Sequence, residues 1–162
     1  MGEKGYIDLQ QRQEFLTMYI SGQLFGIPVM QVQDVLDNQT VTHIPLAPPE
    51  IAGSLNLRGR IVTAIDVRVR LNDTVDQEDV DSSMSVVVEN GDDLYSLVVD
   101  NVGDVLALSQ DEYEKNPPNL SPVWKEISGG IYRLDKDLLV VLDVARLLKS
   151  VYPSDAPILE RE

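Results

Sequence analysis

The 162-residue chain contains no cysteine and only one histidine, His43. Without cysteine, it forms neither disulfides nor a thiolate nucleophile or metal ligand. His43 lies in TVTHIPLAPPE with no nucleophile or orienting carboxylate near it in the sequence, so we interpret it as a loop residue without catalytic function. Gly-rich phosphate loops and the CxxC, HExxH and GxSxG motifs are also missing, and nothing singles out a carboxylate pair for acid–base catalysis. We therefore expect no enzyme, no cofactor and no metal site.

Long hydrophobic runs are missing as well. The longest uncharged apolar runs, IVTAI at 61–65 and LLVVL at 138–142, are far shorter than the roughly 20 residues of a membrane-spanning helix. The N-terminal segment MGEKGYIDLQQRQEF has no apolar core of a signal peptide. The sequence therefore predicts a cytoplasmic protein with no direct membrane insertion.

Positive charge is scarce. Thirteen basic side chains against 27 acidic ones give a formal net charge of −14. This charge repels nucleic acids and anionic lipids at long range, so neither is expected as a partner. The densest acidic stretch, DTVDQEDVD at 73–81, lacks the spacing, central glycine and closing glutamate of an EF-hand, and we interpret it as a solvated loop.

The pattern that is present is mostly that of β-strands joined by tight turns. Ser21-Gly22, Gly91-Asp92 and Arg58-Gly59-Arg60 each separate two apolar runs and predict hairpin turns. The expected strands lie at 14–20, 23–27, 54–67, 83–89 and 93–100, with a further hairpin in EISGGIYRLDKDLLVVLDV.

Three segments depart from this pattern. Val29, Val32, Val35 and Leu36 recur at a spacing that permits a short amphipathic helical turn. The proline-rich segment 116–124 predicts an extended connector, and 143–151 predicts a short helix that closes the core before Pro153.

An internal repeat organises the chain. LFGIPVMQVQDVL (24–36) aligns without gaps onto LYSLVVDNVGDVL (94–106), with six identities where chance predicts roughly one. The identical pairs are Leu24/Leu94, Val29/Val99, Val32/Val102, Asp34/Asp104, Val35/Val105 and Leu36/Leu106. Residues 51–71 likewise resemble 127–148, matching Gly53 to Gly129 and Asp66 to Asp143 if the second hairpin turn holds one extra residue.

Two copies of one β-rich subdomain explain this repetition. A curled sheet of five or six short strands closes as a small barrel, because closure removes exposed edges. We therefore expect an all-β fold, mainly β with short helices, built as two small barrels that share a core. The domain is expected to span 14–151, with subdomain pieces near 14–82 and 83–151 that can exchange some strands, and with flexible tails at 1–13 and 152–162.

Three polar residues stand out. Arg58 lies at a hairpin apex beside a glycine, where its guanidinium could bind a partner's carboxylate or form a surface ion pair with a local acid. Asp66 and Asp143 each end an apolar strand, as a phospho-accepting aspartate does. They are repeat-equivalent and each precedes an expected helix, which favours helix capping.

These residues also carry a family resemblance. The segments EFLTMYISGQLFGIPVMQVQDVL, IPLAPPEIAGSLNLRGRIVTAIDVR and LVVDNVGDVLAL resemble the CheW family of chemotaxis coupling proteins, from about Glu14 to Val151. The resemblance implies a scaffold without catalysis, made of two SH3-like barrels. It also implies two partners, the cytoplasmic tip of a chemoreceptor and the histidine kinase CheA with its CheW-like regulatory domain, and a location at membrane receptor arrays.

The resemblance also implies site residues. Receptor contacts are expected at Val32, Asp34, Gly53, Asn56 and Arg58, with Arg58 pairing with a receptor carboxylate. Kinase contacts are expected at Gly59, Val102 and Val105, although a turn glycine and apolar repeat positions also fit a purely structural role.

Two departures from the family leave the receptor class open. This chain has Asp34 where the family often has glutamate, and Thr63-Ala64 where it often has a proline. With no kinase or receiver segment present, we expect a stand-alone coupling protein. A coupling protein of a non-flagellar pathway such as pilus motility, and a small phospho-accepting protein using Asp66, are the alternatives.

Overall fold

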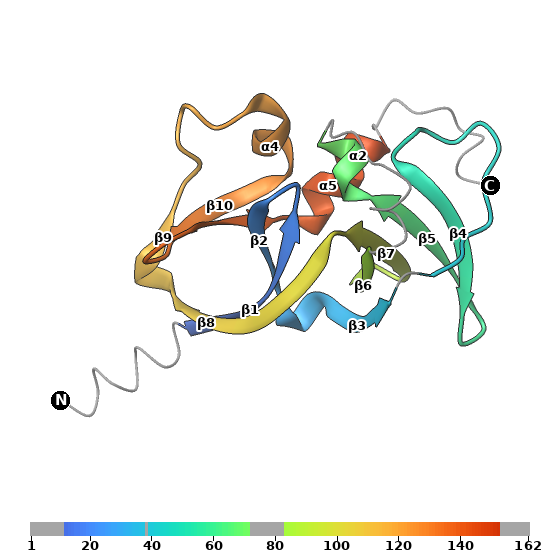
Figure 1. The fold of residues 1–162 in the computed structure, drawn as a ribbon, viewed down its shortest axis with the longest axis horizontal. Helices are drawn as coiled ribbons and strands as arrows, with labels where there is room; N and C mark the ends of the chain where they lie inside the picture. The colour runs from blue at the N-terminus through green and yellow to red at the C-terminus, as the bar shows by residue number, and fades with distance from the viewer. Residues whose placement is uncertain (1–11, 38, 72–82, 153–162) are drawn as a thin grey trace.

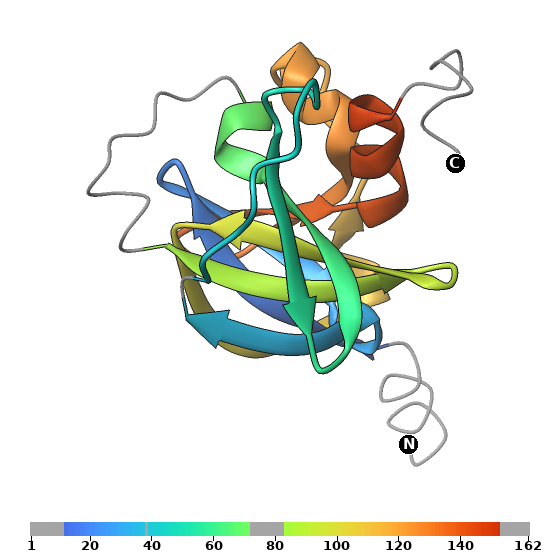
Figure 2. The same ribbon diagram turned by 90° about the vertical axis from the view of Figure 1, so that its right-hand side faces the viewer.

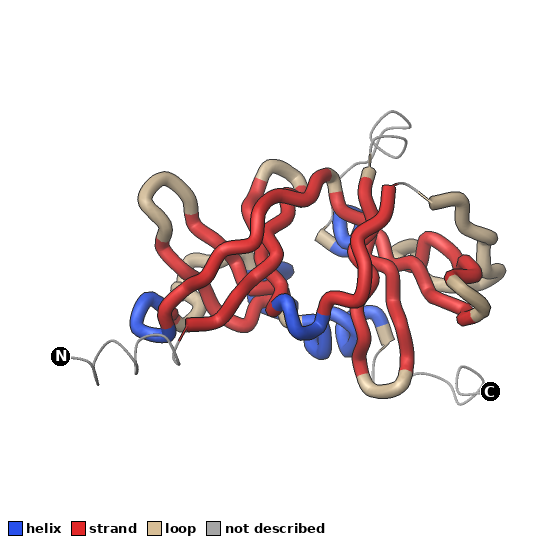
Figure 3. Tube along the Cα trace, turned by 90° about the horizontal axis from the view of Figure 1, so that it is seen from below, coloured by secondary structure: helices blue, strands red, loops and turns tan. Residues whose placement is uncertain are grey.

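Two β-sheets make up most of the computed structural model, which describes residues 12–37, 39–71 and 83–152 (Figure 1). Sheet A contains, in spatial order, β8 (Asn101–Ser109), β1 (Arg12–Ile20), β2 (Gln23–Pro28), β11 (Leu138–Leu142), β10 (Ser128–Arg133) and β9 (Tyr113–Glu114). Sheet B contains β3 (Val32–Asp37), β6 (Met84–Asn90), β7 (Asp93–Val99), β5 (Arg60–Asp66) and β4 (Ile51–Leu57). The predicted mainly-β fold is confirmed, and Figure 3 shows how few of the described residues are helical.

Short helices gather at one end of the molecule (Figures 1 and 2). They are α2 (Val67–Arg70), α4 (Pro122–Ile127) and α5 (Val144–Val151), and the 3-10 turns η1 (Val29–Gln31) and η2 (Gln110–Glu112) lie elsewhere in the chain. The side chain of Asp66 accepts a hydrogen bond from the Arg68 backbone, and that of Asp143 accepts one from Arg146. Both aspartates therefore cap helices, as their repeat-equivalent positions predicted.

The short helical turn allowed for between Val29 and Leu36 is present as η1. It is followed by β3, a strand paired with β6 in which Val32, Asp34 and Leu36 are half-buried and their neighbours are exposed. One local prediction was wrong in part: the proline-rich connector expected over 116–124 gives way to α4 at Pro122, since proline is well tolerated in the first turn of a helix. The acidic stretch 73–81 and the C-terminal tail lie outside the described residues.

The two sheets exchange strands between the halves of the sequence. After the β1–β2 hairpin the chain crosses to sheet B, where β3 pairs with β6, and after the β6–β7 hairpin it crosses to sheet A, where β8 pairs with β1. Figure 1 shows β8 running from the side of β7 to the outer edge of sheet A. Segments 14–82 and 83–151 therefore both contribute strands to both sheets.

The strand registers reproduce the sequence repeat in space. In sheet A, Phe25 of β2 lies opposite Val140 of β11, and in sheet B, Tyr95 of β7 lies opposite Thr63 of β5, both in parallel pairs. Phe25 and Tyr95 are 70 positions apart, and Thr63 and Val140 are 77 apart, matching the offsets of Leu24/Leu94 and Asp66/Asp143. With these offsets, each strand of sheet A from β8 to β10 has an equivalent strand in sheet B. The strands β8-β1-β2-β11-β10 therefore occur in the same spatial order as their equivalents β3-β6-β7-β5-β4.

One detail of the repeat alignment was wrong. In the β4–β5 hairpin, two residues separate the paired residues Leu57 and Arg60. In the β10–β11 hairpin, the backbone N–H of Leu134 donates to the backbone oxygen of Asp137 at 2.8 Å, and two residues again lie between them. No extra residue is present, so Gly53 corresponds to Gly130 and not to Gly129. Both glycines have positive φ, 154° and 127°, beside a register shift in their strands.

One apolar core joins the sheets and helices. Phe25 and Ile27 of sheet A meet Val86 and Leu97 of sheet B in this core, and all four side chains are fully buried. Helix α5 closes it, as predicted, with its buried residues Val144, Leu147, Leu148 and Val151. Burying each such side chain contributes about 1.5–3 kcal/mol, so the sheets stabilise one another.

Sheet A is strongly curved. A second apolar cluster contains Phe15, Leu24, Leu108, Tyr132 and Leu139. These residues come from β1, β2, β8, β10 and β11, so strands that are far apart in the order of the sheet pack against one another. Closure of either sheet into a complete barrel stays a prediction.

Arg68 of α2 is a buried cation. Its side chain is 1% exposed, and its Nε and one terminal nitrogen donate to the two carboxylate oxygens of Asp66, each at 3.0 Å. The other terminal nitrogen donates to Asp100 at 3.1 Å, and Asp100 also accepts from the Ser21 backbone at 2.7 Å. Burial lowers the pKa of Arg68, but its hydrogen bonds and charge interactions with Asp66 and Asp100 raise the pKa overall. This cluster ties α2 to the crossing between β7 and β8 and to the β1–β2 turn.

Replacing Gly53 with alanine tests the close approach of the backbone at Thr42 to strand β4. A Cβ there would lie 2.5 Å from the backbone oxygen of Thr42, whose backbone pairs with that of Ser54. We expect Gly53→Ala to lower the free energy of unfolding by about 2 kcal/mol or more, measured by urea denaturation. Gly91→Ala, with nothing within 4 Å, should cost only about 1 kcal/mol. Equal losses would contradict the close approach.

Replacing Arg68 with methionine tests the buried ion cluster. The change leaves two carboxylates without their cation, one of them buried, so we expect the free energy of unfolding to fall by about 3–5 kcal/mol. Arg60→Met, at an exposed arginine, should cost less than about 1 kcal/mol. Similar urea midpoints for the two variants would show that Arg68 does not hold this part of the fold.

Candidate protein-interaction site

A two-residue turn at Arg58-Gly59 forms the tip of the β4–β5 hairpin. Arg58 has φ of 51° and Gly59 has φ of 87°, as the type I′ turn of a tight hairpin requires. The side-chain oxygen of Asn56 accepts a hydrogen bond from the Gly59 backbone at 3.0 Å and fixes the turn. The predicted hairpin apex is confirmed, and the tip projects away from the helical end of the molecule (Figures 1 and 2).

Arg58 forms an ion pair with Asp34. One terminal nitrogen of the guanidinium lies 2.9 Å from a carboxylate oxygen of Asp34, and the two side chains are 76% and 25% exposed. An ion pair this exposed contributes at most about 1 kcal/mol, so either partner can be exchanged at little cost. The structure thus brings together two of the predicted receptor residues and supplies the local acid for Arg58.

The Arg58 turn is held against other parts of sheet B. Asp34 lies on β3 and Arg58 follows β4, and these strands occupy the opposite edges of the sheet, so the ion pair connects its two edges. On the other side of the turn, Arg60 donates to the backbone oxygen of Asp92 in the β6–β7 turn at 2.9 Å. The arginine is therefore presented from a braced hairpin.

Two other residues predicted to contact the receptor, Gly53 and Val32, lie outside the turn and are not exposed. Gly53 is buried in β4, where the chain at Thr42 passes close to it. Val32 is half-buried and packs against the main core. Of the residues predicted to contact the receptor, Asp34, Asn56 and Arg58 are the ones that lie together at this hairpin tip.

The predicted kinase residues fall in two places. Val102 and Val105 lie on β8, the outer strand of sheet A, whereas Gly59 shares the turn with Arg58 in sheet B. Val105 is 49% exposed, while Val102 is half-buried and packs against the main core. Val105 is the one of these three that presents an apolar side chain to solvent.

Two exposed apolar residues were missed by the sequence analysis, Ile61 in the Arg58 hairpin and Leu46 in the loop before β4. Ile61 is 72% exposed and lies opposite Asn56 in the hairpin, and strand alternation with the buried Val62 could have indicated it. Leu46 is fully exposed with φ of 66°, in a turn where Ala47 donates to the backbone oxygen of Ile44. Pro45 is the sequence signal for that turn.

Asp66 is poorly placed to accept a phosphoryl group. It is 8% exposed, and its two carboxylate oxygens contact the buried Arg68 and cap α2. His43 is exposed. Among residues 12–37, 39–71 and 83–152, no group of three His, Cys, Asp or Glu side chains could hold a metal ion. Within the same ranges, no helix has the length and apolar character that crossing a membrane requires.

Comparison with known proteins gives consistent matches. The family model described as CheW-like domain matches residues 14–152. The chemotaxis protein CheW of Klebsiella aerogenes is 32% identical over 138 residues, which cover 85% of this chain and 82% of that protein. The chemotaxis protein CheW of Treponema pallidum is 27% identical over 140 residues, covering 85% and 82%.

The crystal structure of the scaffolding protein TtCheW from Thermoanaerobacter tengcongensis has the same fold, with a TM-score of 0.74 at 24% identity. The match covers 81% of this chain and 88% of that one. Because the family model spans most of the chain and a relative is more than 30% identical over most of its length, this chain belongs to the CheW-like domain family.

Proposed function

We propose that this chain, a non-catalytic chemotaxis adaptor, contacts a chemoreceptor through the Arg58 turn and the histidine kinase CheA through the outer edge of β8. Family membership is the observation that carries the adaptor function, since the matching relatives are chemotaxis proteins and TtCheW is a scaffolding protein. The finer proposal is that the chain sits in membrane receptor arrays and holds the receptor's cytoplasmic tip and the regulatory domain of CheA together.

Charge supports the Arg58 turn as the receptor site. An acidic segment of a receptor is repelled at long range by a chain of net charge −14, and the turn Arg58-Gly59-Arg60 is a local exception. The Arg58 guanidinium offers a fork of donors that matches a carboxylate, and its exposed pair with Asp34 costs little to exchange. Exposed Ile61, beside the turn, adds apolar contact area.

Comparison of the two repeat copies also supports this site. The turn that corresponds to Arg58-Gly59 is Asp135-Lys136, between Leu134 and Asp137. The second copy keeps the same turn length but carries aspartate in place of arginine, and its two turn residues lack the positive φ of Arg58 and Gly59. A two-residue turn therefore forms at this place in the fold without arginine, which favours a role for Arg58 in binding.

The remaining receptor residues support Arg58 without contacting the partner, in this proposal. Asn56 fixes the turn through the Gly59 backbone, Gly53 permits the close approach of Thr42, and Val32 anchors β3 in the core. Asp34 orients the guanidinium in the absence of receptor.

For the kinase, Val105 is the proposed contact because it is an exposed apolar side chain on an outer strand. Val102 acts by packing against the core, and Gly59 acts by allowing the turn geometry, since its φ of 87° suits glycine. The two partners then contact different sheets of one rigid unit.

A non-flagellar pathway, such as pilus motility, would use the same surfaces, and the identity of the cognate receptor and kinase separates it from flagellar chemotaxis. The phospho-acceptor alternative is not favoured, because Asp66 is engaged by Arg68 and caps a helix.

Charge reversal at Arg58 tests the receptor site. We expect Arg58→Glu to reduce capture of a receptor cytoplasmic fragment by at least about tenfold, because the new glutamate would repel the receptor carboxylate that Arg58 is proposed to bind. Capture of CheA should stay within about twofold. The measurement is a quantitative pull-down with purified partners. Arg133→Glu is a matched control, since Arg133 is also exposed and forms an ion pair with Glu114 at 2.8 Å. Equal loss of receptor in both variants would refute the site.

A charge on the β8 edge tests the kinase surface. Val105→Glu should weaken binding to the CheA regulatory domain by at least about tenfold, measured by calorimetry, because it places an unpaired carboxylate in an apolar contact. Its free energy of unfolding should change by less than about 0.5 kcal/mol, since the side chain is half exposed. Val35→Glu, at the repeat-equivalent position on β3, should leave this affinity unchanged. Unaltered CheA binding by Val105→Glu would disprove the assignment.

A further inference from the structure

A basic pocket lies at the helical end of the molecule. It is lined by Glu126 of α4 and by Arg146, Lys149 and Ser150 of α5, with a volume of about 250 Å³. The pocket is remote from the Arg58 turn, because helix α2 follows the far end of β5, whose seven residues span about 23 Å. It is therefore a different surface from the proposed receptor site.

Positive charge is concentrated around this pocket. Helices α2, α4 and α5 bring together Arg70, Lys125, Arg146 and Lys149, in a chain where acidic residues outnumber basic ones by 27 to 13. The acids on or capping these helices are Asp66, Glu126 and Asp143, and Asp66 pairs with the buried Arg68 of α2. The helical end is thus locally positive against an acidic background.

Part of this charge has a structural role. Arg70 is 11% exposed, and it donates to the Ser150 hydroxyl at 2.8 Å and to the carboxylate of Glu126. Arg70 therefore ties α2 to α4 and α5, and it compensates the one acidic side chain in the pocket lining.

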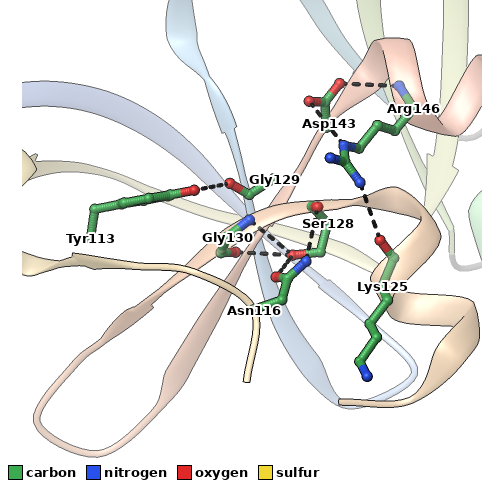
Figure 4. Close-up of polar contacts among 8 residues, drawn as sticks. All are labelled: Tyr113, Asn116, Lys125, Ser128, Gly129, Gly130, Asp143 and Arg146. Carbon is green, nitrogen blue, oxygen red and sulfur yellow. Dashed lines mark hydrogen bonds and ion pairs between the residues drawn. The ribbon is translucent and has the colours of Figure 1, made fainter. Parts of the chain in front are cut away.

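The two cations that line the pocket, Arg146 and Lys149, are weakly compensated. The Nε of Arg146 lies 3.9 Å from Asp143, and another of its nitrogens reaches the Lys125 backbone oxygen only at 3.5 Å (Figure 4). Both contacts are long, and the Arg146 side chain is 55% exposed. Lys149 lies three residues further along α5, on the same exposed face. These two side chains can turn their donors to an incoming anion.

We propose that this pocket binds the carboxylates of an acidic peptide segment of a protein partner. A guanidinium fork and an ammonium group spaced three residues apart on one helix suit two neighbouring carboxylates. The pocket volume fits one or two side chains, whereas the net charge of the whole chain opposes a long polyanion. The pocket shares no residue with the Arg58 turn, so an acidic partner segment would bind at the opposite end of the adaptor.

Fluorescence anisotropy with a labelled hexaglutamate peptide tests this proposal, with hexaglutamine as the uncharged probe. We expect the wild-type chain to bind hexaglutamate at low salt, with affinity falling as salt rises. Arg146→Gln with Lys149→Gln should weaken that binding by about tenfold, because both exposed cations are removed. Circular dichroism and urea unfolding check that the variant remains folded.

A matched variant distinguishes this pocket from basic side chains elsewhere on the surface. Lys115→Gln with Lys136→Gln removes the same charge from exposed positions outside the pocket, and it should leave the affinity within about twofold. The proposal is overturned if the wild-type chain does not bind, if hexaglutamine binds equally well, or if the control variant loses as much affinity as the pocket variant.

Discussion

The exchange of β3 and β8 between the two sheets is the constraint on which the rest of this structure depends. Each repeat supplies a hairpin to one sheet and its next strand to the other, so neither sheet can form from one continuous half of the chain. The shared core, which α5 closes, is a consequence of that crossing. Because both sheets lose strand partners if either opens, the domain should unfold as one unit, and the surfaces on the two sheets are held in a fixed relation. A fixed relation between two partner surfaces is what an adaptor requires.

The two repeat copies share the residues that the backbone conformation requires and differ at their hairpin tips and around α2. Helix-capping aspartates at 66 and 143 and positive-φ glycines at 53 and 130 occur in both copies, because each answers a local backbone requirement. The hairpin tips differ, with arginine in one and aspartate in the other, and the buried cation Arg68 corresponds to Ala145 in the second copy. The copies thus share a framework, and their differences mark the tip proposed for binding and the ion cluster that secures α2.

Local features were predictable from the sequence, and long-range pairing was not. Turn residues and alternation placed the hairpins and α5 correctly, since those depend on neighbouring residues. The repeat indicated two equivalent subdomains and allowed strand exchange between them. Because repeated segments can pair within or between copies, it did not show that β3 and β8 are the strands exchanged. For the site, the apex of Arg58 followed from its glycine, whereas its partner Asp34 is 24 positions away on the opposite edge of the sheet. The partner of Arg68 at Asp100 is 32 positions away in sequence and was missed for the same reason.

The most direct test of this account is calorimetric titration of a chemoreceptor cytoplasmic fragment into the free adaptor and into the adaptor saturated with the CheA regulatory domain. An adaptor with separate partner surfaces on two interlocked sheets should bind the receptor fragment with the same stoichiometry in both titrations and with affinities within about tenfold of each other. Loss of receptor binding in the presence of saturating CheA domain would show that the partners compete for one surface and would contradict the account.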